Sequence, residues 1–261
     1  MDLSLKGKVA LVGGASQGIG YAIARLLAAE GARVAMIGRR EEPLEAAARR
    51  IAAETGSETL PVAADIRRAE DCARIVESAI ARFGGVDVLV NNDGAPPLGR
   101  LESFDDGAWS RAVEQNLMSV VRLARGVLPG MRERRWGRVV NIAALSVLQP
   151  IPQFGLSVAT WAGVIGYAKT LSIEVAGEGV TVHTICPGRI ETPRLGTVFG
   201  GGQPGAVDGD KLAEMTRQIP MQRLGSPDEI AGLVGFLASP WSGYMTGCVF
   251  HVDGGRRAGV L

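Results

Sequence analysis

A glycine-rich segment follows directly after the first apolar run of the chain and opens a stretch of helical character. Glycine lets the backbone turn tightly and approach a pyrophosphate, which then binds at the N-terminus of the following helix. A turn that binds nothing is the alternative, but the position between a strand and a helix favours a ligand. The segment therefore predicts a dinucleotide site formed by Gly14, Ser16, Gln17, Gly18, Ile19 and Gly20.

Two adjacent arginines, Arg39 and Arg40, follow the second apolar run, and no carboxylate occurs before Glu41. Dinucleotide folds that bind NAD place an acidic residue here, where it binds the ribose hydroxyls. A guanidinium group instead pairs with a 2′-phosphate, to which Ser16 and Gln17 can add hydrogen bonds. The alternative is that both arginines only solvate a helix start, where cations are unfavourable unless an anion binds. We therefore expect NADP(H) as the cofactor.

The elements that must position these residues alternate regularly along the chain. Short, almost continuously apolar runs predict parallel strands covered on both faces, and longer stretches between them predict helices. This order predicts right-handed crossovers and a single doubly wound α/β domain of the Rossmann type. The expected strands are 9–12, 34–37, 59–63, 86–90, 138–142, 180–185 and 248–252. The expected helices are 19–30, 42–55, 69–83, 109–132, 156–176 and 227–237.

The composition excludes several classes of protein. The chain has 28 Lys+Arg against 27 Asp+Glu, whereas nucleic acids and anionic membranes require clustered basic surface. No apolar run reaches about 18 residues, and the first residues do not form a signal peptide. Cys72, Cys186 and Cys248 lie far apart, without metal-ligand spacing. We expect a cytoplasmic protein with no metal, no membrane and no nucleic-acid partner.

Residues 196–209 interrupt the alternation with six glycines and one proline. A loop of this length inside a compact domain is typically a binding lid or is disordered. We therefore expect one domain over residues 1–261, with a flexible substrate lid at about 190–224.

Five further motifs occur in order along the chain. They are Asp65 with Ile66 after the third strand, Asn91-Asn92-Asp93-Gly94 after the fourth, Asn116 in a helix, Pro187-Gly188-Arg189-Ile190-Glu191-Thr192, and Val252-Asp253-Gly254-Gly255. Together with the glycine turn they resemble the classical short-chain dehydrogenase/reductase family over essentially the whole chain. The resemblance implies a sheet of seven parallel strands, a nicotinamide cofactor and a homo-oligomer, commonly a tetramer, with a dimer as the alternative. It also assigns cofactor contacts to Asp65, Ile66, Asn92, Gly94, Pro187, Gly188, Ile190 and Thr192.

The acid–base residues of this family are replaced in the chain. The family uses a serine after the fifth strand and Tyr-x-x-x-Lys in the next helix. Counting from Gly137 and from the pair Ala162-Gly163 places these three positions at Ala144, Ser157 and Trp161. Tyr167 and Lys169 do not substitute for them, because residues two apart on a helix point to nearly opposite sides. The family uses these three residues together with a helix asparagine, and of the four only the asparagine, Asn116, is retained.

Five residues are candidates for the chemistry of the site: Asn116, Ser146, Ser157, Trp161 and Asp93. Ser146 lies two residues beyond the lost serine and is placed to donate a hydrogen bond into the cleft. Asp93 stands where the family has a small alanine. It either bonds the backbone of its own turn or offers negative charge to a positive substrate.

Three functions fit this pattern. The first is an atypical NADPH-dependent reductase of a small molecule that needs little proton donation, either an iminium formed from a hemiaminal or an activated carbonyl. The second is a non-catalytic NADP-binding homologue, acting as a sensor or as an oligomer partner. The third is a non-redox enzyme, which the retained Gly14, Asn91 and Thr192 positions disfavour.

Overall fold

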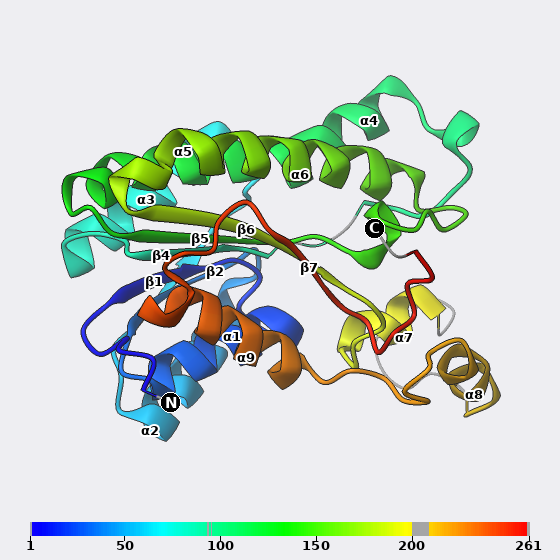
Figure 1. The fold of residues 1–261 in the computed structure, drawn as a ribbon, viewed down its shortest axis with the longest axis horizontal. Coiled ribbons are helices and arrows are strands. Elements are labelled where there is room, and N and C mark those ends of the chain that lie inside the picture. The colour runs from blue at the N-terminus through cyan, green and yellow to red at the C-terminus, as the bar shows by residue number, and fades with distance from the viewer. Residues whose placement is uncertain (1, 93, 95, 200–208, 260–261) are drawn as a thin grey trace.

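Seven strands in the described part of the chain form one sheet, and every neighbouring pair is parallel. The computed structural model describes residues 2–92, 94, 96–199 and 209–259. The strands are β1 (Val9–Val12), β2 (Arg33–Gly38), β3 (Thr59–Ala63), β4 (Val88–Asn91), β5 (Gly137–Ile142), β6 (Val180–Pro187) and β7 (Val249–Val252). Their order across the sheet is β3-β2-β1-β4-β5-β6-β7 (Figure 1), which confirms the predicted doubly wound fold with a seven-stranded parallel sheet.

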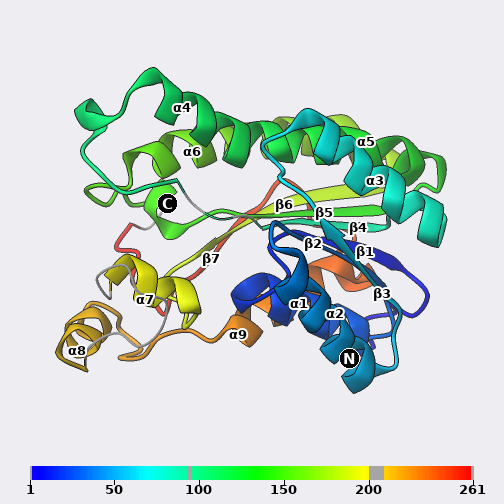
Figure 2. The same cartoon turned by 180° about the vertical axis from the view of Figure 1, so that it is seen from behind.

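Helices cover both faces of this sheet (Figures 1 and 2). One face carries α1 (Gly18–Ala29), α2 (Glu41–Thr55) and α9 (Pro227–Ala238). The other carries α3 (Ala69–Phe83), α4 (Asp106–Val113), α5 (Ser119–Glu133) and α6 (Gly155–Val175). These bounds agree with the expected elements to within a few residues, except for the region of α4 and α5.

The apolar strands bury alternate residues in two separate cores, as the pattern of covered strands requires. In β1, Ala10 and Val12 pack into the core beneath α1, α2 and α9. Val9 and Leu11 pack into the core beneath α3, α5 and α6. All four residues are at most 2% exposed, so the packed sheet fixes the starting points of the loops that follow its strands.

The expected continuous helix over 109–132 is interrupted. A π-helical turn, Glu114–Met118, separates α4 from α5, and the hydroxyl of Ser119 donates to the carbonyl oxygen of Gln115 over 2.5 Å. The turn carries Asn116, whose side chain is buried. The prediction of one unbroken helix is wrong here, since a π-helical turn needs neither proline nor glycine and leaves no mark in the apolar pattern.

The predicted loop at 196–209 begins inside a helix. Helix α7 (Pro193–Phe199) includes its first residues and α8 (Gly209–Arg217) begins at its last residue, while residues 200–208 lie outside the described residues. The described residues do not decide between a binding lid and a disordered segment, and a flexible lid at about 190–224 stays a prediction. None of the described helices is long and apolar enough to cross a membrane.

Candidate functional site

A cavity of about 550 Å³ lies beyond the carboxyl ends of β1, β2 and β3, and we call it the glycine-turn cavity. In doubly wound sheets this edge is where ligands bind. It is lined by Gly14, Ser16, Gln17, Gly18, Ile19, Ile37, Gly38, Arg39, Arg40, Ala64, Asp65, Ile66, Arg67, Asn92, Gly94, Gln115, Thr192, Pro193 and Arg194. Twelve of the sixteen residues expected to bind the cofactor are in this wall.

The glycine turn has no room for side chains. Gly14 has a φ of +58°, and a Cβ there would lie 2.5 Å from the carbonyl oxygen of Asn92. A Cβ at Gly20 would lie 2.4 Å from the carbonyl oxygen of Gly14, which explains why this predicted residue shapes the turn without lining the cavity. Gln17, at the N-cap of α1, makes no side-chain cap hydrogen bond, so the N–H groups of the first turn stay available for an anion. The turn fits a pyrophosphate.

The end of β4 is tied to the same turn. The side-chain amide of Asn92 donates to the carbonyl oxygen of Gly13 over 3.1 Å. One residue earlier, the amide of Asn91 donates to Oδ1 of Asn141 over 2.8 Å, which joins β4 to β5. Asp93, the next residue, lies outside the described residues, so its two alternatives stay open.

Arg39 and Arg40 both line the glycine-turn cavity, at the point where β2 ends and α2 begins. Across the described residues, neither guanidinium group forms an ion pair with a carboxylate. Ser16 and Gln17 line the same cavity. Two cations and two polar side chains at this corner match the requirements of a phosphate group.

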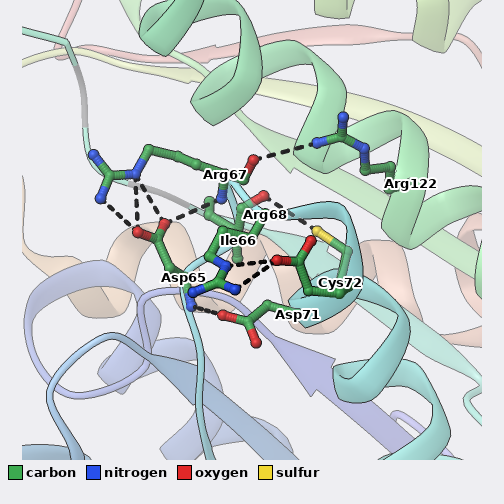
Figure 3. Close-up of polar contacts among 8 residues, drawn as sticks. Asp65, Ile66, Arg67, Arg68, Asp71, Cys72 and Arg122 are labelled. Carbon is green, nitrogen blue, oxygen red and sulfur yellow. Dashed lines mark hydrogen bonds and ion pairs between the residues drawn. The ribbon is translucent and has the colours of Figure 1, made fainter.

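Sequence reasoning missed Arg67, which forms a bidentate pair with the carboxylate of Asp65 (Figure 3). The backbone N–H of Arg67 also donates to Oδ1 of Asp65, over 3.1 Å. These hydrogen bonds hold the pKa of Asp65 below its usual range, against a smaller opposing effect of burial. The N–H of Asp65 donates to the carboxylate of Asp71 over 2.8 Å, which fixes the loop after β3. Both members of the pair line the glycine-turn cavity.

A second cavity, of about 230 Å³, adjoins the first beyond the ends of β5 and β6, and we call it the Trp161 cavity. It is lined by Ile19, Asn92, Ile142, Ala143, Ala144, Leu145, Ser146, Ile151, Phe154, Trp161, Pro187, Gly188, Arg189, Ile190, Thr192, Arg194, Leu195 and Arg256. The predicted cofactor residues Pro187, Gly188 and Ile190 lie in this wall. Ala144 and Trp161, two of the three positions that the motif spacing assigns to the family's acid–base residues, lie there as well.

Ser146 is the candidate that the structure places best. It belongs to the short 3-10 turn Leu145–Val147 after β5, it is buried, and it lines the Trp161 cavity. Its hydroxyl oxygen has no hydrogen-bond partner among the described residues. Buried polar groups are nearly always hydrogen-bonded, so an unpartnered hydroxyl in the wall of this cavity is a candidate contact for a ligand. The hydroxyl of Ser157 is also buried without a partner among the described residues.

Two other candidates are not brought to either cavity. Ser157 lies in the first turn of α6, is only 1% exposed and lines neither wall. Asn116 faces a void of about 10 Å³ on the far side of Trp161, which has room for about one water molecule. The amide of Asn116 donates to the hydroxyl of Thr160 over 2.8 Å. Ile142 and Trp161 line both this void and the Trp161 cavity.

Three arginines in the wall of the Trp161 cavity, Arg189, Arg194 and Arg256, were not singled out from the sequence. They come from the loop after β6, from α7 and from the segment after β7, so no local motif connects them. Within the described residues, no group of three or more His, Cys, Asp or Glu side chains could hold a metal ion.

Comparisons with known proteins agree with this geometry. The family described as "Enoyl-(Acyl carrier protein) reductase" matches residues 14–257. The chain is 40% identical over 255 residues to the 3-oxoacyl-(acyl-carrier-protein) reductase of Vibrio cholerae, covering 97% of this chain and 98% of that protein.

Solved structures are similar over the same extent. The L-sorbose reductase of Gluconobacter frateurii, complexed with NADPH and L-sorbose, superposes with a TM-score of 0.94 at 35% identity, covering 100% of both chains. A variant of the actinorhodin polyketide ketoreductase with NADPH superposes with a TM-score of 0.88 at 35% identity, covering 95% of this chain and 97% of that one.

Proposed function

The chain belongs to the classical short-chain dehydrogenase/reductase family, and we propose that it is an NADPH-dependent reductase of a small organic acceptor. The observation that carries this proposal is the common wall of the two cavities, to which Ile19, Asn92, Thr192 and Arg194 all belong. Because these residues border both cavities, the cavities adjoin each other there. A dinucleotide that extends from the glycine-turn cavity would therefore reach a ligand in the Trp161 cavity. When bound, NADPH supplies a hydride to an electrophilic carbon.

The chain's own residues select the cofactor. The glycine turn and the uncapped N–H groups of α1 bind the pyrophosphate, and Arg39 and Arg40 pair with the 2′-phosphate. The similar structures solved with NADPH support this assignment.

The reaction proceeds without the family's serine, tyrosine and lysine. Ala144 and Trp161 present a methyl group and an indole to the Trp161 cavity, and Ser157 lies buried outside it. A positioned general acid contributes about 10²–10⁴-fold to such a reaction. The acceptor is therefore one whose reduction needs little help from a proton donor.

The acceptor best supported is an activated carbonyl compound, such as a conjugated ketone. Hydride addition leaves a negative charge on the carbonyl oxygen, which the hydroxyl of Ser146 and the arginines around the cavity stabilise until a proton from water completes the alcohol. The relatives named as 3-oxoacyl, L-sorbose and polyketide reductases support a carbonyl substrate.

A cationic iminium, formed from a hemiaminal, is the second candidate. The observation in its favour is the aromatic side chain of Trp161 in the cavity wall, because an indole face attracts a cation by about 0.5–2 kcal/mol. Reduction of an iminium yields a neutral amine, which requires no proton donor. The exchange of the family's lysine for Trp161 also removes a charge that would repel this substrate.

Matched substrates distinguish the two acceptors. NADPH binding is measured by fluorescence, and NADPH oxidation is then followed with conjugated ketones and with cyclic iminium ions of the same carbon skeleton. We expect faster turnover of ketones, which falls about ten- to a hundredfold in Ser146→Ala. Faster turnover of iminium ions, lowered by Trp161→Ala and Asp93→Asn, would establish the second candidate instead. Trp109→Ala, which removes an indole on α4 that lines neither cavity, is the control for Trp161→Ala.

The remaining alternative is a non-catalytic NADP-binding protein, a sensor or an oligomer partner. It would be established if NADPH binds and no acceptor of either class removes deuterium stereospecifically from 4-deuterated NADPH.

We further propose that the protein is a cytoplasmic homo-oligomer, a tetramer or a dimer. Its three cysteines are all free, as a reducing compartment requires. Large apolar side chains at Ile173 on α6 and at Trp241 and Tyr244 before β7 are exposed in the single chain. Light scattering coupled to gel filtration tests this, since a monomer would contradict it.

A further inference from the structure

The wall of the Trp161 cavity contains three positively charged side chains. They are Arg189, Arg194 and Arg256, and no aspartate or glutamate is among the described residues of the wall. The wall also contains apolar and aromatic side chains, among them Ile151, Phe154 and Trp161. A ligand that matches both kinds of lining carries an apolar body and a negative group.

Two of these arginines meet at one neutral atom. Nη2 of Arg189 donates to Oε1 of Gln218 over 2.9 Å, and Nη2 of Arg256 donates to the same oxygen over 3.4 Å. Arg189 also donates to the carbonyl oxygen of Met215 over 2.5 Å. Neutral acceptors therefore orient the two like charges side by side, although they repel each other.

The acidic residue nearest in sequence to Arg256 does not neutralise it by direct contact. Asp253 accepts from the backbone N–H of Gly255 with Oδ1, over 2.9 Å, and from that of Arg257 with Oδ2, over 2.8 Å. No carboxylate of the described chain forms an ion pair with Arg194 or Arg256. These two cations line a cavity with no bound counter-charge from the described residues.

The surroundings of the three guanidinium groups disfavour their charge. Burial lowers the pKa of each below the ordinary value, and at Arg189 the positive charge of Arg256 adds to the effect. The charge of Asp253 opposes this at Arg256, and that of Glu214 does so at Arg189. An anion entering the cavity would relieve the repulsion and restore the lost solvation.

We propose that the Trp161 cavity binds an anionic group of the substrate, a carboxylate or a phosphate, through Arg256 assisted by Arg189 and Arg194. This inference rests on the proposed function, of which it specifies the substrate class: an acceptor with an apolar body and one anionic end. Arg194 also lines the glycine-turn cavity, so it lies where the negative charges of substrate and cofactor are closest.

The experiment compares three probes of one shape: phenylacetate, phenyl phosphate and the neutral phenylacetamide. Each is titrated by calorimetry into the full-length protein at saturating NADPH, so that the cofactor occupies its own phosphate sites. We expect at least one anion to bind about tenfold tighter than phenylacetamide, with a preference that falls as salt rises. The tighter of the two anions identifies a carboxylate or a phosphate as the natural group.

Variants assign the effect to the cavity. Arg256→Gln is expected to lose about tenfold in affinity for the anion and less than twofold for the amide. Arg256→Lys keeps the charge and is expected to retain part of the preference. Arg257→Gln is the matched control, because Arg257 is adjacent in sequence, lines neither cavity and contacts His251 instead. It should bind all three probes as the wild type does.

Phenylacetamide binding as tightly as both anions, or no binding of any probe, would overturn the proposal. So would an equal loss in Arg256→Gln and Arg257→Gln. Failure of the proposed function gives a different result, which is either absence of NADPH binding in the wild type or NADPH binding without oxidation by any acceptor. In either case, titration of the three probes into the protein without NADPH still tests whether the Trp161 cavity binds an anion.

Discussion

The carbonyl oxygen of Asn92 lies where a side chain on Gly14 would have to be. A Cβ on Gly14 would approach this oxygen to 2.5 Å, and the amide of the same asparagine bonds the carbonyl of Gly13. The backbone at the end of β4 therefore packs directly against the backbone of the glycine turn after β1. Binding of a pyrophosphate at this turn would require such an arrangement, because only bare backbone leaves it room.

We predict that Gly14→Ala weakens NADPH binding at least about tenfold and destabilises the fold by more than the roughly 1–2 kcal/mol expected for a left-handed alanine. Gly56→Ala is the control, since Gly56 has a φ of +71° but no atom near the position of a Cβ. Fluorescence titration with NADPH and urea unfolding measure the two effects. Equal stability losses in both variants, with NADPH affinity intact, would contradict the fit.

A second prediction concerns the choice of cofactor. Arg39→Ala should weaken NADPH binding about ten- to a hundredfold, because it removes a charge-assisted contact with the 2′-phosphate. NADH binding should change by no more than about twofold, since NADH lacks that phosphate. Arg49→Ala, on the exposed side of α2, provides the control. Equal weakening of both nucleotides would show that Arg39 does not select NADPH.

Restoring the family's acid–base pair should not improve the enzyme. Ser157 is 1% exposed, so Ser157→Tyr places a large ring in a packed site at a cost of about 1–3 kcal/mol. Trp161→Lys removes a wall of the cavity at the same time. We expect the double variant to melt at a lower temperature and to turn over the best ketone of the panel more slowly. Faster turnover would indicate that the site uses the family's ordinary acid–base chemistry and that Ser157 and Trp161 only impair it.

Stability should depend on pH through His183. This residue is buried against Phe250, with ring centroids 5.6 Å apart, and burial lowers its pKa to about 4. The unfolded chain takes up the proton near the ordinary pKa of 6.5, so stability is fully present above that pH and is lost as pH falls from 6.5 towards 4. At pH 5 the loss should be about 2 kcal/mol relative to pH 7.5.

Urea unfolding at the two pH values measures this loss in the wild type, in His183→Asn and in His251→Asn. The first variant should lose this part of the pH dependence. The second should keep it, because His251 is exposed on β7. An unchanged slope in His183→Asn would assign the effect to the carboxylates.

Local patterns determined most of the fold. The continuously apolar runs predicted six of the seven strands, and 59–63 was expected as a weaker strand that completes the series. A parallel strand covered on both faces does not alternate with polar residues, as the two separate cores on either side of β1 illustrate. The glycine turn, Arg39 and Arg40 were also identifiable, because each acts through its own backbone or charge at a fixed place after a strand. The motif spacing also singled out Ala144 and Trp161, and both residues line the Trp161 cavity, while their assignment to the family's acid–base positions stays a prediction.

Tertiary structure alone decided which side chains share a cavity. Ser146 and Ser157 were both candidates in the sequence and both are buried, yet only Ser146, on the 3-10 turn after β5, lines the Trp161 cavity. The π-helical turn at Asn116 depends on packing and left no sequence pattern. Arg189, Arg194 and Arg256 come from three segments, and no spacing along the chain encodes their distance in space. Only the folded sheet, which brings the carboxyl ends of its strands to one edge, makes them neighbours.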